Sequence, residues 1–126
     1  MTLSFDGNTG PYVQYTYART CSVLEKAGEC TTYEFVITAN EESELLKTLA
    51  KFPEKVKSAL DAYEPSIVTR YILDVAAAFN RFYHNCQILS ADDDKIKKTR
   101  IMLTKATNIV LGNAFELICM KKTTKI

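Results

Sequence analysis

The fold of this chain is decided by the stretch Pro65–Tyr83, which runs PSIVTRYILDVAAAFNRFY. Its apolar residues recur every three or four positions, which is the period of one face of an α-helix. These residues are Ile67, Val68, Tyr71, Ile72, Val75, Ala76, Phe79, Phe82 and Tyr83. Pro65 suits the first turn of a helix, because the N–H that proline lacks has no partner there. The stretch therefore predicts a long helix with its apolar face in the core.

Start and stop residues divide the preceding part of the chain in the same way. A first helix is expected to begin at Thr9-Gly10-Pro11 and to end at Gly28. The segment Tyr33–Thr38 alternates apolar and β-branched residues, but it is too short and isolated to make a sheet. We expect it to be a short extended segment that crosses the helices.

Three further helices complete the predicted fold. Asn40 is a suitable N-cap for the second, Pro53 opens the third, and Asp92–Asp94 places capping oxygens and negative charge at the start of the fifth. The sequence thus predicts an all-α bundle of about five helices with one short extended segment. The positions expected in its core are Leu24, Leu46, Leu49, Ile72, Val75, Phe79, Leu103, Val110 and Leu117.

Size and composition indicate a single domain, residues 1–126, because 126 residues with 47% hydrophobic content can bury one core. No apolar run is long enough to span a bilayer, and the first residues lack a secretory signal, so a cytoplasmic location is expected. The four cysteines, at positions 21, 30, 86 and 119, form no C-x-x-C pair, and His84 is the only histidine. We therefore expect reduced thiols and no metal site.

The net charge of +1 conceals an uneven distribution. Residues 95–126 carry eight basic residues against Glu116 alone, whereas residues 1–94 carry eight basic and fourteen acidic residues. A basic end is a possible footprint for a polyanion. Lysines are also common on solvated helix faces, so the pattern alone leaves both interpretations open.

The first predicted helix carries a cluster of tyrosines near an arginine. Tyr12, Tyr15 and Arg19 stand at i, i+3 and i+7, which places them on one helix face. Aromatic rings stack on unpaired RNA bases, and a guanidinium pairs with a phosphate or a base edge. The alternative is that the tyrosines are half-buried core residues with surface hydroxyls. No arrangement of residues in the sequence supports catalysis.

The run Phe5–Arg19, FDGNTGPYVQYTYAR, closely resembles the pattern F-D-G-x-T-G-P-Y-x-Q-Y-x-x-A-R of arginyl-tRNA synthetases. In that family the pattern lies where the catalytic domain passes into the C-terminal, DALR-type anticodon-binding domain. The resemblance continues through Ser43–Lys47, Phe52-Pro53, Tyr63–Ser66 and Tyr71–Tyr83, and so covers nearly the whole chain. The end of the chain departs from it, because the family's usual Gly, Pro and terminal Met are missing and Ile126 stands last.

The resemblance implies that Tyr12, Tyr15, Arg19 and Tyr83 bind the anticodon loop of an arginine tRNA. It also implies that residues 1–10 are the end of a linker from a catalytic domain. The expected partners are therefore the arginine tRNA and that catalytic domain. ATP and magnesium would serve the full-length arginine-tRNA ligase only, and we expect this chain to have no cofactor and no activity alone. We expect a monomer that binds neither DNA nor membrane. A helical domain that docks a protein through its tyrosine-rich face is the alternative.

Overall fold

A computed structural model describes residues 9–28 and 35–118. Within these residues the chain forms five α-helices: α1 (Thr9–Ala27), α2 (Asn40–Ala50), α3 (Phe52–Ala62), α4 (Ser66–Asn85) and α5 (Asp94–Leu117). The predicted all-α class and the number of helices are confirmed. None of these helices is long and apolar enough to cross a membrane.

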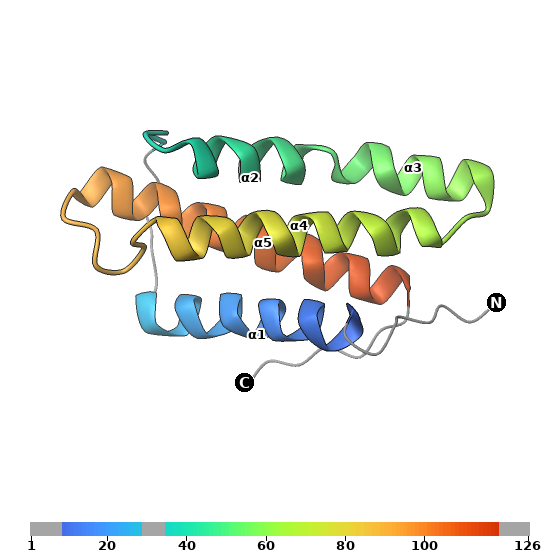
Figure 1. Ribbon diagram of the computed structural model, residues 1–126, viewed down its shortest axis with the longest axis horizontal. Helices are drawn as coiled ribbons and strands as arrows, with labels where there is room; N and C mark the ends of the chain where they lie inside the picture. Colours follow the sequence, from blue (N-terminus) through green and yellow to red (C-terminus); the bar gives the residue numbers. More distant parts are fainter. Residues whose placement is uncertain (1–8, 29–34, 119–126) are drawn as a thin grey trace.

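Helix α4 is the centre of the bundle. It packs against each of the other four helices, and α1 also packs along α5. Figure 1 shows α2 and α3 end to end along one side of α4, and α1 along the opposite side, with α5 behind. Helix α1 therefore contacts the second half of α4, although the two helices are far apart in the sequence.

The apolar face predicted for α4 is the core of the protein. The buried residues of this helix are Val68, Tyr71, Ile72, Val75, Ala76, Ala78, Phe79 and Phe82. Phe79 and Phe82 are fully buried, with ring centroids 5.8 Å apart. The Tyr71 hydroxyl donates to the carbonyl oxygens of Thr48 and Leu49, at 2.6 and 3.2 Å. These two bonds attach the end of α2 to the first half of α4.

The predicted core is correct except at one position. Leu49, Ile72, Val75, Phe79 and Leu103 are buried, and Leu24, Leu46 and Val110 are partly buried against the same core. Leu117, however, is 52% exposed. It is the last residue of α5, and it lies two residues, or about 200°, from the fully buried Phe115 around the helix. The core face at this end of α5 belongs to Phe115.

The start of α2 also differs from the prediction. Asn40 is the first residue of the helix, and the cap is Ala39, whose side chain cannot accept a hydrogen bond. Glu42 replaces a capping side chain, because its Oε1 accepts from the backbone N–H groups of Thr38 and Ala39, at 2.9 and 2.7 Å. The expected extended segment is described only from residue 35. Residues 35–38 form neither helix nor strand, as expected.

Glu42 also forms a buried ion pair that joins α2 to α5. The Arg100 Nε lies 2.9 Å from Glu42 Oε2, and the Glu42 side chain is fully buried. Burial alone would raise the pKa of Glu42, but the hydrogen bonds from Arg100, Ala39 and Thr38 outweigh it, so this pKa lies below its usual value. Arg100 Nη1 also donates to the Gln87 carbonyl oxygen at 2.7 Å. One guanidinium thus fixes both α2 and the segment that follows α4.

Candidate nucleic-acid interface

The tyrosines of α1 divide between the surface and the core. Tyr12 is 40% exposed and Tyr15 is 45% exposed, whereas Tyr17 is buried against Phe115, with ring centroids 5.3 Å apart. The helical period accounts for this division, because Val13 and Tyr17 are four residues apart and share the inner face. Tyr12 and Tyr15 are therefore not core residues, and they present parts of their rings to solvent.

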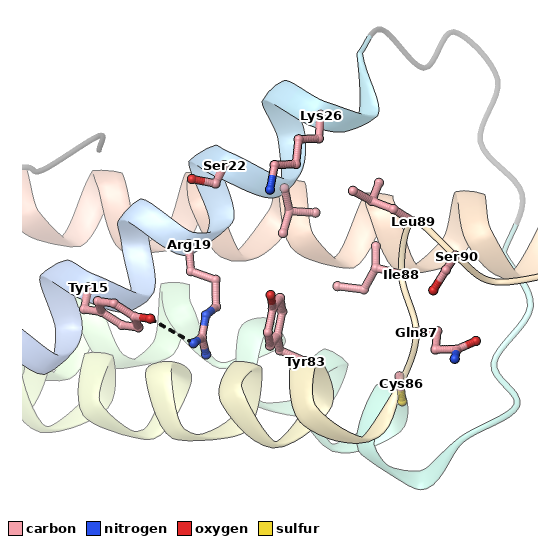
Figure 2. Close-up of a pocket in the computed structure, with 11 residues that line it drawn as sticks. Tyr15, Arg19, Ser22, Lys26, Tyr83, Cys86, Gln87, Ile88, Leu89 and Ser90 are labelled. Atoms are coloured by element: carbon pink, nitrogen blue, oxygen red, sulfur yellow. Dashed lines mark hydrogen bonds between the residues drawn. The ribbon is translucent and has the colours of Figure 1, made fainter. Parts of the chain in front are cut away.

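Arg19 lies between two tyrosine rings from different helices. Its Cζ is 4.9 Å from the ring centroid of Tyr15 and 4.2 Å from the ring centroid of Tyr83 on α4. Arg19 Nη2 also donates to the Tyr15 hydroxyl at 3.2 Å. Figure 2 shows the guanidinium between the two rings, with this bond dashed. The contacts are cation–π interactions, which hold the three side chains as one unit.

Asn80 is the hydrogen-bonding centre of the same surface. Its Oδ1 accepts from Arg19 Nη1 at 2.8 Å. Its Nδ2 donates to the Tyr12 hydroxyl at 3.1 Å and to Thr16 Oγ1 at 2.9 Å. One amide of α4 therefore sets the positions of three side chains of α1. We call Tyr12, Tyr15, Arg19, Asn80 and Tyr83 the α1–α4 cluster.

Two hollows adjoin the α1–α4 cluster, and Tyr15 and Arg19 line both. The first, of about 540 Å³, is called the Tyr12 hollow. Its other lining residues are Tyr12, Ala77, Asn80, Arg81, His84 and Asn85. The second, of about 470 Å³, is called the Lys26 hollow and is drawn in Figure 2. Its other lining residues are Ser22, Val23, Lys26, Tyr83, Cys86, Gln87, Ile88, Leu89 and Ser90.

Both hollows are lined by positively charged side chains. Arg19 and Arg81 line the Tyr12 hollow, Arg19 and Lys26 line the Lys26 hollow, and no Asp or Glu lines either of them. The nearly neutral chain therefore gathers basic groups without carboxylates around exposed aromatic rings. Such a surface favours an anionic ligand with flat, stackable groups.

The basic charge counted on the last predicted helix is partly neutralised. Arg100 is paired with Glu42, and Lys98 Nζ lies 3.0 Å from Asp94 Oδ2. Arg100 is thus not a candidate for a phosphate contact. The lysines at positions 121, 122 and 125 lie outside the described residues.

The structure brings together all four residues singled out from the sequence. Helical spacing alone gave Tyr12, Tyr15 and Arg19, while Tyr83 came from the family resemblance. Sequence reasoning missed Asn80, although it stands inside the run Tyr71–Tyr83 that carries the family resemblance. It also missed Lys26 and Arg81, which line the hollows. Ile126 lies outside the described residues.

The described residues give little support for a metal site or for a reactive thiol. In residues 9–28 and 35–118, no three His, Cys, Asp or Glu side chains gather as metal ligands would. Cys21 and Cys86 are free thiols, while Cys30 and Cys119 lie outside the described residues. Burial raises the pKa of the Cys86 thiol, which keeps it protonated and makes it a poor nucleophile.

Comparisons with known proteins identify the family of this chain. The family model of the DALR anticodon binding domain matches residues 13–126. The arginine–tRNA ligase of Clostridium beijerinckii is 48% identical over 118 residues, which are 92% of this chain and 21% of that protein. That of Clostridium acetobutylicum is 45% identical over 119 residues, with the same coverage. The chain thus spans about a fifth of the length of these curated relatives.

Solved structures show the same fold. The chain superposes on an arginyl-tRNA synthetase of Thermus thermophilus with a TM-score of 0.87 and 32% identity, over 98% of this chain and 22% of that one. An arginyl-tRNA synthetase of Plasmodium falciparum gives a TM-score of 0.79 and 30% identity, over 96% of this chain and 22% of that one. On the family match and on these superpositions, the chain belongs to the DALR anticodon-binding domain family.

Proposed function

We propose that this chain is the anticodon-binding domain of an arginyl-tRNA synthetase and that the α1–α4 cluster binds the anticodon loop of an arginine tRNA. The observation that carries the proposal is the guanidinium of Arg19 held between the half-exposed rings of Tyr15 and Tyr83. Family membership supports a role in anticodon binding. The names of the similar proteins support arginine as the amino acid.

The chemistry of the cluster suits unpaired bases. The solvent-facing parts of Tyr12, Tyr15 and Tyr83 offer stacking surfaces, and each stacked base contributes roughly 1–3 kcal/mol. Arg19, Arg81 and Lys26 supply positive charge for the phosphates between those bases. Binding should therefore weaken steeply as salt is raised.

A single site can recognise every arginine tRNA through one shared base. All arginine codons have G at their centre, so all arginine anticodons have C at theirs. In the Tyr12 hollow, the side chains of Arg81 and Asn85 offer hydrogen-bond donors and an acceptor to a base edge. We assign the central C to this hollow. The tRNA would in this way be held while an attached catalytic domain acts at its 3′ end.

The whole enzyme's activity is part of the proposal. With its catalytic domain, ATP and magnesium, the full-length protein would be an arginine-tRNA ligase of the cytoplasm. This chain alone should not activate arginine. Arginine-dependent exchange of pyrophosphate into ATP by the chain alone would contradict that expectation.

The test compares three RNA stem-loops with the purified chain. The first has an arginine anticodon, the second has its central C replaced by A, and the third has one stem pair inverted. Replacing the central C should weaken binding by about 1–3 kcal/mol, while inverting the stem pair should have little effect, because paired bases conceal their edges. Equal binding of all three, or binding indifferent to salt, would favour the protein-docking alternative.

A further inference from the structure

The Lys26 hollow is separate from the Tyr12 hollow, although the two share a wall. Tyr12 lines only the first hollow and Tyr83 only the second, with Tyr15 and Arg19 between them. The α1–α4 cluster thus offers a cavity on each side of the guanidinium. A volume of about 470 Å³ lies within the range of about 300–1,000 Å³ typical of small-ligand sites. Each cavity can take a separate nucleotide.

We propose that the Lys26 hollow is a second nucleotide subsite, which takes the unpaired base next to the central C without distinguishing its identity. The inference rests on the proposed function. It adds a second place on the protein and a second kind of recognition, by stacking and charge.

The wall of the Lys26 hollow opposite α1 is firmly held. The segment 86–90 forms this wall, and Cys86 and Ile88 within it are buried. The Cys86 N–H donates to the Phe82 carbonyl oxygen at 2.9 Å, and Arg100 Nη1 donates to the Gln87 carbonyl oxygen at 2.7 Å. The cavity is therefore formed before any ligand binds, which lowers the entropy cost of binding.

The lining of the Lys26 hollow suits the face of a base. Tyr83, Val23, Ile88 and Leu89 supply a ring and aliphatic side chains. In Figure 2, the amine of Lys26 points from α1 into the hollow, which places a positive charge beside a nucleotide bound there. An ammonium group is a point charge that binds phosphate without requiring a fixed geometry.

The two hollows should recognise a nucleotide in different ways, the Tyr12 hollow through the base edge and the Lys26 hollow through the base face. The Tyr12 hollow contains three side chains that can hydrogen-bond a base edge: Arg81, His84 and Asn85. Besides the cations Arg19 and Lys26, the polar side chains that line the Lys26 hollow are those of Ser22, Gln87 and Ser90. The one carboxamide among them, that of Gln87, points away from Tyr83 in Figure 2. Stacking tolerates any base, because every base has a π-face. This tolerance fits the bases beside the central C, which vary among arginine anticodons.

The experiment combines a protein variant that fills the Lys26 hollow from α1 with RNA loops that lack the base this hollow would hold. Ser22→Phe places a large side chain at the hollow from a position that is not buried. The probes are an arginine anticodon stem-loop, the same loop with the base 5′ or 3′ of the central C made abasic, and the same loop with those bases exchanged. Binding constants are measured for the parent and the variant.

For the parent, we expect one of the two flanking abasic loops to bind about tenfold more weakly, the size of a lost stack, and the exchanged bases to bind equally. Ser22→Phe should bind the intact loop about tenfold more weakly and should lose its sensitivity to that abasic site. It should keep its sensitivity to the central C. Equal sensitivity of parent and variant to the flanking abasic site would overturn the subsite while leaving the proposed function intact.

A charge variant tests the same hollow without adding bulk. Lys26→Gln should weaken binding and lower the salt slope by about one unit, as expected for a lost phosphate contact. Lys47→Gln on the outer side of α2 is the matched control and should behave like the parent. Equal salt slopes for Lys26→Gln and Lys47→Gln would contradict the phosphate contact. Failure of the parent to bind any of the loops would overturn the proposed function and the subsite together.

Discussion

Asn80 of α4 accepts a hydrogen bond from Arg19 of α1, with Arg19 Nη1 2.8 Å from Asn80 Oδ1, although 61 residues separate them in the sequence. The same amide donates to the Tyr12 hydroxyl. The carboxamide thus holds the guanidinium between the rings of Tyr15 and Tyr83. Asn80 is a positioning residue, because it sets the geometry of groups that are proposed to contact RNA.

Replacement of Asn80 tests this role. Asn80→Ala removes the acceptor of Arg19 and the donor to Tyr12, so we expect binding to the arginine anticodon stem-loop to fall by about tenfold, the size of one hydrogen bond to a charged group. Asn113→Ala on the exposed face of α5 is the control and should bind like the parent. Parent-like binding by a well-folded Asn80→Ala variant would refute the positioning role.

Arg19 should act through its planar shape as well as its charge. Arg19→Lys keeps the charge but loses the flat group between two rings, so binding should weaken while the salt slope stays near the parent value. Arg19→Ala should weaken binding and, where Arg19 contacts a phosphate, reduce the slope by about one unit. Affinity of Arg19→Lys equal to that of the parent would show that charge alone matters.

Truncation of a side chain that packs α4 into the core should lower the stability of the protein more than truncation of an exposed one. Phe79 is fully buried among helices, so Phe79→Ala should lower the free energy of unfolding by about 3–5 kcal/mol. Leu117→Ala at the exposed end of α5 should change it by about 0.5 kcal/mol or less. Urea unfolding followed by far-UV circular dichroism measures both. Similar losses for the two variants would mean that the helix faces are assigned wrongly.

The buried ion pair should make stability depend on pH. The pKa of Glu42 is below its ordinary value of 4.5 in the folded protein, so its contribution is complete above about pH 4.5 and is lost as pH falls through the folded pKa. Glu42→Gln lacks that contribution. The difference in unfolding free energy between parent and variant should be large at pH 7 and should narrow at pH 3. A difference independent of pH would contradict the assigned pKa shift.

The fold could be predicted from local signals, because three prolines and an acidic cap mark helix ends that depend only on nearby residues. Pro11, Pro53, Pro65 and Asp93 all lie at helix starts in the structure. Asn40 was misassigned because the carboxylate of Glu42, two residues further on, satisfies the start of α2. Leu117 was misassigned because the end of α5 carries two large apolar residues, Phe115 and Leu117, that lie about 200° apart around the helix, so only one of them can face the core.

The sequence pattern predicted only the site residues that lie close to one another in the chain. Tyr12, Tyr15 and Arg19 share a turn spacing that the sequence displays, and Tyr83 required the family resemblance. The bonds of Asn80 and the two hollows arise from the packing of α1 against α4 and the 86–90 segment. Contacts between residues about sixty positions apart leave no periodic pattern in a single sequence.

The most direct measurement of the RNA face is the affinity of Tyr15→Ala and Tyr83→Ala for an arginine anticodon stem-loop, with Tyr63→Ala as control. Tyr63 is 92% exposed and lies beyond the end of α3, away from the α1–α4 cluster. Tyr15→Ala and Tyr83→Ala should each weaken binding by about 1–3 kcal/mol with little change in salt slope, whereas Tyr63→Ala should bind like the parent. Parent-like binding by all three variants would contradict an RNA face at the α1–α4 cluster.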